Sequence, residues 1–588
     1  MAAPVDRGET LAHMTPAPAA APPATADPAR EVGDANVAAD VIPYRLRIGV
    51  TGHRRLPDDP ALAAQVARAV RRIRELAPSS PHTPLRVAAI SPLAEGADRL
   101  VAGQVLADEG TMLEAALPLP RDDYMRDFET AGSRREFDGF LARASGVVVL
   151  PPCETRGEAY ERAGRYIVEH SDAMIALWDG APARGRGGTA EIVDYARARD
   201  VPLFWVHTEA PYVLSEERGE KLAAGAFGAL DTYNRARLAG RRLDRATALA
   251  QGQEGNLAEG SAQAGLGGAF MRPYCAWMLP HFVRADILAQ RYQSLYYLFG
   301  DLLFYCGAGA VAVAGLAAIV GEGVEGVARW SLPGLETALM LLVLLVLFAG
   351  RRLRLHERWL AYRFLAERFR SGLILAPALP PGPRLVTADT ARAEDAAERW
   401  LGRAYDEVWA ERPHPTTPTP SAVPAAPPVA DAGVPLDGLK ALLLSAWIED
   451  QISYQRKAVR RYERRHRRGT GLTAAIFALT LAAAVAHGVE VRGAVAGIPL
   501  GGVPIFLSIA LPAFAGAVAA ISAQREYPRN AHRAHQMARN LEEMRRRLAH
   551  TSTLEGLREV AQEAEAVMLA ENRDWFVVMR FHDFELHV

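Results

Sequence analysis

Three short segments in the N-terminal third of the chain carry groups that could bind a phosphate-bearing ligand. Thr51–Arg54 places a hydroxyl, an imidazole and a guanidinium beside a glycine. Glu95–Asp98 carries two carboxyl groups around Gly96, and Gly185–Glu191 reads GRGGTAE. A glycine-rich loop that opens a helix offers free backbone N–H groups to an anion, and arginine pairs with phosphate. A carboxylate can accept a hydrogen bond from ribose, so these residue types together indicate a nucleotide-type ligand.

Each segment also has a simpler interpretation. The loop around Gly187 could be a flexible turn, and Asp98 could cap a helix. His53 could bond only to backbone, and Asp179-Gly180 is a common turn pair. The binding interpretation depends on the segments meeting in space. The candidate ligand-binding residues are Thr51, Gly52, His53, Arg54, Glu95, Gly96, Asp98, Asp179, Gly187, Gly188, Thr189 and Glu191.

The elements around these segments predict such a meeting. Between Tyr44 and Pro211, short β-type stretches alternate with helical patterns, which predicts a Rossmann-like α/β domain with helices on both faces of a parallel sheet. The expected strands are Arg45–Val50, Leu85–Ile90, Met112–Leu117, Gly146–Leu150, Ala173–Trp178 and Pro202–Val206, and the expected helices include Ala61–Leu76, Ala97–Asp108 and Ala190–Arg199. The candidate segments follow the first, second and fifth strands. Ligands of such sheets bind beyond the carboxyl ends of the strands.

The rest of the chain has the pattern of a membrane protein. Four apolar stretches, at about 302–320, 335–350, 471–489 and 505–523, are each long enough to be considered as spans of a hydrocarbon core of roughly 30 Å. They come as two pairs, which predicts an all-α membrane region with four transmembrane helices in two hairpins. Arginines cluster outside each hairpin, as at Arg351 and Arg352, whereas each connecting loop has one. The positive-inside rule then places the N- and C-termini in the cytoplasm.

Composition sets the domain boundaries and excludes some partners. The chain has 588 residues and a formal net charge of −1, so its overall charge does not indicate a nucleic-acid partner. Cys153, Cys275 and Cys306 have no CxxC spacing, and we expect neither a disulfide framework nor a metal site. The predicted domains are a disordered Ala/Pro-rich tail at 1–43, the α/β domain at 44–211, a helical connector at 212–283 with a glycine-rich loop at Gly252–Gly268, a first membrane unit at 284–411, a Pro-rich linker at 412–436 and a second membrane unit at 437–588.

The α/β domain resembles the SLOG superfamily, the Rossmann-like fold shared by DprA-type and LOG-type nucleotide-binding proteins. The resemblance covers about a third of the chain. It rests on Ile48-Gly49-Val50-Thr51-Gly52-His53-Arg54, Glu95-Gly96-Ala97-Asp98, Ile175-Ala176-Leu177-Trp178-Asp179-Gly180 and Gly187-Gly188-Thr189-Ala190-Glu191.

The two hairpins resemble SLATT domains, the two-helix membrane modules found beside SLOG sensors in bacterial conflict systems. The matching residues are His356-Glu357-Arg358-Trp359, Arg363 and Ala366-Glu367 at the first hairpin, and Trp447-Ile448-Glu449-Asp450-Gln451, Tyr454 and Trp575 at the second. The resemblances imply a multi-pass effector of the bacterial inner membrane. Its cytosolic domain would sense a nucleotide-derived ligand, with no other cofactor, and its spans would perturb the bilayer, by a pore in a homo-oligomer.

Two other functions remain open. LOG-type proteins hydrolyse the bond between base and ribose phosphate with a GGxGTxxE loop, so the protein could be a nucleotide N-glycosidic hydrolase. Here the loop lacks the spacer before the threonine, and Ile192 stands three residues after Thr189. Glu191 would be the catalytic acid, or Asp194 in its place. A constitutive transporter would need charges within the spans. Glu336, Asp301 and His487 lie in or near them, and Glu336 is the best candidate.

Overall fold

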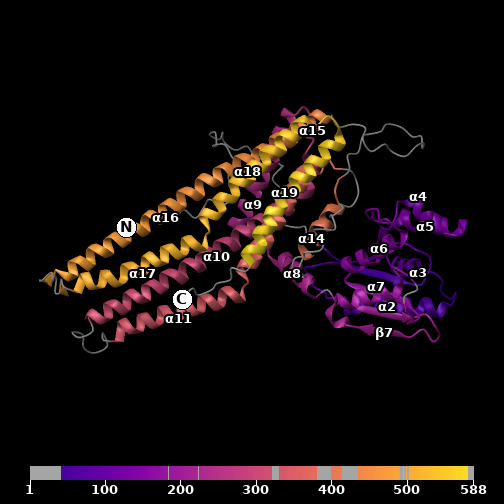
Figure 1. Ribbon diagram of the computed structural model, residues 1–588, viewed down its shortest axis with the longest axis horizontal. Coiled ribbons are helices and arrows are strands. Elements are labelled where there is room, and N and C mark those ends of the chain that lie inside the picture. The colour runs from indigo at the N-terminus through magenta and orange to yellow at the C-terminus, as the bar shows by residue number, and fades with distance from the viewer. Residues whose placement is uncertain are drawn as a thin grey trace. The chain divides into compact units, whose positions relative to one another are not determined.

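The computed structural model describes residues 41–182, 185–222, 224–320, 330–379, 399–413, 435–489, 494–495, 498–499 and 502–580. Almost all of the predicted tail and of the Pro-rich linker lies outside these ranges. The chain forms two compact units. Within the described residues, a sheet unit comprises 41–239 and 399–413, and a helical unit comprises 240–379 and 435–580. Figure 1 labels their elements.

The sheet unit contains a seven-stranded sheet in the order β4-β3-β2-β1-β5-β6-β7. The strands are β1 (Tyr44–Gly52), β2 (Leu85–Ser91), β3 (Met112–Leu117), β4 (Gly146–Val149), β5 (Ala173–Trp178), β6 (Leu203–His207) and β7 (Leu214–Glu217). The first six run parallel, which confirms the predicted fold class, and β7 adds an unpredicted antiparallel edge. Every residue of β5 is buried, as expected of a central strand covered on both faces.

Helices cover both faces of this sheet. They are α2 (Pro60–Leu76), α3 (Ala97–Val105), α4 (Arg121–Tyr124), α5 (Ala131–Arg143), α6 (Arg156–His170), α7 (Thr189–Ala198), α8 (Ala224–Arg235) and α14 (Arg399–Ala410), with the 3₁₀ turns η1 (Met125–Asp127) and η2 (Gly219–Lys221). In α2, Asp59 caps the helix by accepting a hydrogen bond from the Ala61 amide at 2.8 Å. Leu62, Val66 and Ile73 form its buried stripe.

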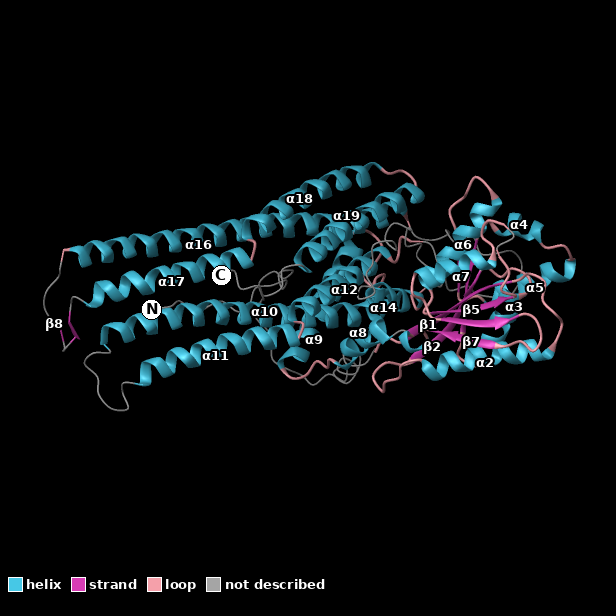
Figure 2. Cartoon of the chain, turned by 60° about the horizontal axis from the view of Figure 1, so that its bottom comes forward, coloured by secondary structure: helices cyan, strands magenta, loops and turns pink. Residues whose placement is uncertain are grey.

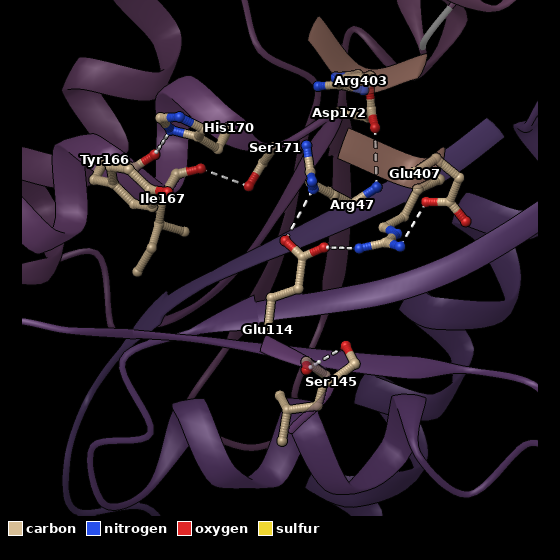
Figure 3. Close-up of polar contacts among 12 residues, drawn as sticks. Arg47, Glu114, Ser145, Tyr166, Ile167, His170, Ser171, Asp172, Arg403 and Glu407 are labelled. Carbon is tan, nitrogen blue, oxygen red and sulfur yellow. Dashed lines mark hydrogen bonds and ion pairs between the residues drawn. The ribbon is translucent and has the colours of Figure 1, made fainter. Parts of the chain in front are cut away.

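The most distant segment of the sheet unit in sequence is α14, which packs on β1 and α8. Glu407 of α14 contacts Arg45 at 2.5 Å and Arg86 at 2.8 Å. Arg403 of the same helix contacts Asp172 (Figure 3). The sequence prediction had grouped this helix with the first membrane unit at 284–411. The predicted connector at 212–283 also divides, since α8 belongs to the sheet unit and α9 to the helical unit.

The helical unit is built from long helices (Figure 2). Its elements are α9 (Arg241–Gln263), α10 (Arg272–Val320), α11 (Ser331–Arg352), α12 (Leu355–Leu375), α15 (Leu436–Leu443), the π-helix η4 (Leu444–Glu449), α16 (Asp450–Gly488), the short strands β8 (Ala494–Val495) and β9 (Ile498–Pro499), α17 (Gly502–Gln524), α18 (Tyr527–His550) and α19 (Leu554–Arg580). The predicted loop at Gly252–Gly268 is wrong for most of its length, because α9 continues to Gln263. Tertiary packing of α9 on α10 overrides the low helix propensity of its glycines.

Among the described residues of this unit, four helices are long and apolar enough to cross a membrane. The predicted spans lie within α10, α11, α17 and, up to its last residue, α16. Large apolar side chains such as Leu344, Phe348 and Leu481 are exposed on these helices, as expected of surfaces that face lipid. Glu336 is the sixth residue of α11 and so stands near one end of that helix.

The two hairpins pack together through α10 and α17, with α11 and α16 on the outer sides (Figure 1). Small residues allow this approach: a Cβ atom on Gly502 would come within 2.6 Å of Ile319, and one on Gly315 within 3.1 Å of Ile509. At one end of the pair, Arg525 donates to both carboxylate oxygens of Asp301 at 2.7 and 2.8 Å. The helical unit therefore holds its two hairpins as one packed layer.

Candidate functional site

A cavity of about 510 Å³ lies at the carboxyl edge of the sheet, beyond β1, β2 and β5. Its position is the one that the strand order predicts, because β1 and β5 are neighbours at the point where the order of the parallel strands reverses. The predicted residues that line it are Thr51, Gly52, His53, Arg54, Asp98, Asp179, Gly187, Gly188 and Thr189. The structure thus brings together residues from all three candidate segments.

Glycines allow the end of β1 to lie against the start of α3. A Cβ atom on Gly52 would lie 2.4 Å from the Ala97 side chain. Gly96 has a φ of +78°, and a Cβ atom there would lie 2.4 Å from the carbonyl oxygens of His53 and Arg54. Gly96 therefore does not line the cavity. Its missing side chain leaves room for the Thr51–Arg54 segment, which does.

His53 connects β1 to the end of β5. Its Nε2 atom lies 3.2 Å from the Asp179 backbone nitrogen and 3.1 Å from Asp179 Oδ1. The first contact needs a neutral ring that accepts at Nε2, and the second needs a proton on that atom. Asp179 Oδ1 also accepts a hydrogen bond from the Ala181 amide at 2.9 Å, as in an Asx turn. Both simple interpretations, backbone bonding by His53 and a turn at Asp179, hold within the wall of the cavity.

Asp98 is the buried carboxyl group of the site. It lies in the first turn of α3, is 6% exposed, and accepts a hydrogen bond from the Ala94 amide at 3.0 Å. Burial raises the pKa of this carboxyl to about 7, although the Ala94 amide and the guanidinium groups of Arg54 and Arg99 oppose the shift. Near neutral pH, Asp98 can therefore either donate or accept a proton.

The glycine-rich loop leads into α7, whose N-cap is Gly188. Gly187 has a φ of +76°, and a Cβ atom there would lie 2.6 Å from the backbone nitrogen of Glu161 in α6. The amide of Gly187 donates to Glu191 Oε2 at 2.8 Å. Glu191 thus holds the loop that precedes its own helix and does not line the cavity. The first amides of α7, from Thr189 onward, have no partner within the helix, as at any helix start.

The two arginines that line the cavity differ in their surroundings. Arg186 lines the cavity, but its guanidinium contacts Glu161 at 2.5 Å and Glu158 at 2.8 Å, both on α6. Its charge is therefore largely neutralised by protein. Arg54 also lines the cavity and lies over the ring of Tyr160, 5.2 Å from its centroid. Arg54 is the better placed of the two for an anionic group.

The sequence patterns do not predict the cavity wall that α4 and α6 provide. Tyr124 and Tyr160 line the cavity together with Ile167 and Gly164. The Tyr160 hydroxyl donates to Asp127. The stretch 121–170 carries two amphipathic helical patterns, but nothing in their spacing indicates which side chains face a ligand. Only the packing of α6 beside α7 brings Tyr160 to the carboxyl edge.

Glu95 is the remaining predicted residue outside the cavity lining. Its carboxylate accepts a hydrogen bond from the Ser133 hydroxyl of α5. Among the residues that the structure describes, no group of three His, Cys, Asp or Glu side chains is arranged to hold a metal ion. The cavity instead combines hydroxyl, guanidinium and helix-start donors with the carboxyl groups of Asp98 and Asp179. Such a set can bind an anionic group at one end and hydroxyl groups at the other.

Comparison with known families identifies part of the helical unit. Residues 444–575 match SLATT_1, described as the SMODS and SLOG-associating 2TM effector domain 1. The match begins at η4 and contains α16, α17 and α18 with most of α19. No curated protein matches the chain. The second hairpin is therefore a SLATT effector domain, and the likeness of the first hairpin and of the SLOG segments remains a prediction.

Proposed function

We propose that the protein is a bacterial membrane effector whose α/β domain senses a nucleotide-derived ligand in the cytoplasm and whose spans then perturb the bilayer. One observation carries the proposal: a cavity at the carboxyl edge of a parallel sheet shares a chain with a SLATT effector domain. A cavity of about 510 Å³ falls within the usual size of small-molecule sites, roughly 300–1,000 Å³.

The chemistry of the cavity supports a nucleotide rather than an apolar ligand. Arg54 and the helix start at Thr189 would hold a phosphate group. Asp98 and Asp179 would accept hydrogen bonds from sugar hydroxyl groups, and Tyr160 with Trp178 would contact the base. The ligand acts as a switch only if it binds one arrangement of the protein better than another. Since one layer of four helices encloses no wide channel, the membrane activity would require a homo-oligomer.

Membrane potential provides the direct test. Cells that express the wild type are compared with cells that express Gly188→Asp, with a potential-sensitive dye as the readout. Aspartate is a favourable N-cap, so the variant should fold, while its carboxylate would occupy the amides of α7 and repel a phosphate. Gly139→Asp makes the same change on the exposed surface of α5, where a Cβ atom meets nothing within 4 Å.

When the ligand is present in the cells, we expect the wild type and Gly139→Asp to depolarise the membrane. We expect Gly188→Asp not to depolarise it. Equal depolarisation by all three proteins would show that the cavity does not control the membrane part. Binding of nucleotides by the purified full-length protein, measured by calorimetry, provides the second readout. Cyclic and NAD-related nucleotides belong in that set, and no heat from any of them would count against the proposed ligand class.

The second candidate function is nucleotide N-glycosidic hydrolysis, and Asp98 is the observation in its favour. A carboxyl group whose pKa is raised to about 7 can serve as a general acid or base. The predicted acid, Glu191, instead bonds to the Gly187 amide. Release of free base or nicotinamide by the full-length protein, abolished in Asp98→Asn, would support hydrolysis. Loss in Glu191→Ala alone would assign the reaction to the loop acid.

A further inference from the structure

A second cavity, of about 430 Å³, lies between α16 and α18 of the helical unit. On α16 its lining residues recur at helical spacing and so share one face, and on α18 they lie three residues apart. The lining residues are Glu449, which ends η4, with Ile452, Ser453, Arg456, Lys457, Arg460, Glu542 and Arg545. Four of these side chains are cationic and two are anionic.

The anionic side chains hold the two helices together. Arg456 of α16 contacts Glu542 of α18 at 2.6 Å, and Arg545 of α18 lies 3.7 Å from Glu449. These pairs neutralise two of the four cations. Lys457 and Arg460 have no carboxylate within ion-pair distance among the residues that the structure describes. The cavity therefore keeps an excess of two positive charges, with the Ser453 hydroxyl beside them.

The first half of the helical unit is packed by aromatic side chains just before its apolar part. There α10 and α12 meet through aromatic rings, with Tyr296 and Trp359 at 5.5 Å and Tyr292 and Tyr362 at 5.4 Å between centroids. Both tyrosines of α10 lie closer to the apolar part of their helix than the cavity residues lie to that of α16.

The cavity also stands away from the apolar stretch of its helix. The apolar part of α16 begins at about Gly471, so Arg460 lies roughly 16 Å before it along the helix axis and Glu449 roughly 33 Å. Lipid headgroups extend only about 5–8 Å beyond each side of the hydrocarbon core. The arginines nearest the bilayer are Arg464 to Arg468, which the cavity does not include. Its position favours a ligand from the aqueous phase.

We propose that this cavity is a second, separate site, which binds a phosphate-bearing anion. Arginine presents paired donors that match phosphate oxygens, and lysine adds a point charge. Bound phosphate would contact α16 and α18 at once and so fix the spacing of the two helices on the cytoplasmic side of a SLATT hairpin. The site consists wholly of the helical unit and does not depend on the ligand proposed for the sheet cavity.

Calorimetry with inorganic pyrophosphate on full-length protein in nanodiscs of zwitterionic lipid tests the proposal. All proteins carry Gly188→Asp, which removes the sheet cavity as a competing site. Lys457→Gln/Arg460→Gln removes the two lining cations that have no carboxylate within ion-pair distance among the described residues. Arg464→Gln/Arg467→Gln is the matched control, because it removes two charges at the same spacing from exposed positions of the same helix.

We expect the cavity pair to weaken pyrophosphate binding at least about tenfold and the control pair less than about twofold. A second arm measures retention of anionic phospholipid by the same proteins in mixed nanodiscs. Selective loss of lipid in the cavity pair would support the phosphate site and identify a headgroup as its source. Equal weakening by both pairs would show that the anion is attracted by the overall positive charge of α16. No effect of the cavity pair in either arm would show that the cavity binds no such anion. Either result would overturn the proposal.

Discussion

Asp98 shows how one residue can link the stability of the sheet unit to pH. Its carboxyl is buried, and its pKa is raised from 3.8 to about 7. Between these values the folded protein keeps a proton that the unfolded chain has released. The free energy of unfolding therefore falls as pH rises from about 4 to about 7 and changes little above that range. The ionised group is the form that burial disfavours.

Replacing Asp98 with asparagine should remove this pH dependence. The asparagine oxygen can still accept from the Ala94 amide, and no charge is buried at any pH. We compare the free energy of unfolding of the variant with that of wild type. We expect this difference to change in favour of the variant by roughly 2–4 kcal/mol as pH rises from 4.5 to 8. Hydrogen exchange of the β1 and β5 amides in the full-length protein, compared with wild type at each pH, measures the difference.

Asp194→Asn is the control for this substitution. Asp194 stands on α7 with its side chain largely exposed, beside Arg197 at 3.5 Å. Between pH 4.5 and pH 8, the free energy of unfolding of Asp194→Asn relative to wild type should change by less than about 0.5 kcal/mol. An Asp98→Asn protein whose exchange follows wild type at both pH values would contradict the raised pKa.

At the scale of elements, α14 shows which part of the fold sequence patterns could not predict. The six parallel strands were predictable because each is a short apolar stretch between turn residues, and β5 is buried throughout. The apolar spans were predictable from length alone. Docking of α14 depends on Glu407 reaching Arg45 and Arg86 across more than 300 residues. Nothing local in its amphipathic pattern distinguishes a sheet partner from a helical one.

The candidate site was likewise predictable from the sequence only in part. Residues at strand ends, such as Thr51 and Asp179, were predictable because parallel topology places them at one edge. The roles of Glu95 and Glu191 were not, because their carboxylates turn toward Ser133 and the Gly187 amide. Tyr160 reaches the cavity from α6 through tertiary packing, which leaves no periodic signal.

The ion pairs of α14 lead to a prediction about how firmly it is held. Arg47 and Arg45 flank Glu114, and although burial alone would raise the pKa of Glu114, the two guanidinium groups lower it to about 2 (Figure 3). Glu407→Gln takes away the second partner of buried Arg45. We expect this substitution to lower the free energy of opening of α14 by roughly 2–4 kcal/mol. Hydrogen exchange of the α14 amides in the full-length protein measures it.

Glu411→Gln, one residue beyond the end of α14, is the matched change. Glu411 contacts Arg86 at 3.0 Å, but its side chain is 58% exposed, so its loss should cost less than about 0.5 kcal/mol. Equal protection of α14 in the two variants would show that apolar packing alone, through residues such as Trp400 and Tyr405, holds the helix in place.

At the scale of the whole molecule, the four spans and the arginine distribution predict one orientation. Arg351 and Arg352 end α11, and a dense arginine segment precedes the apolar part of α16. Moving such segments across the bilayer is unfavourable, so both hairpins should enter from the cytoplasm and return to it. Trp330 before α11 and Val489 after α16 then lie outside the cell; each is 73% exposed.

Cysteine labelling can test this orientation in a background where Cys153, Cys275 and Cys306 are replaced by serine. In spheroplasts of an expressing bacterium, we expect a membrane-impermeant maleimide to label Trp330→Cys and Val489→Cys without permeabilisation. The exposed Leu353, after α11, and Arg464, before the apolar part of α16, should become reactive as Leu353→Cys and Arg464→Cys only once the membrane is opened. Labelling of Leu353→Cys in intact spheroplasts would place the arginine clusters outside. The sheet unit would then face away from the cytoplasm, and its cavity would lack the proposed source of a nucleotide ligand.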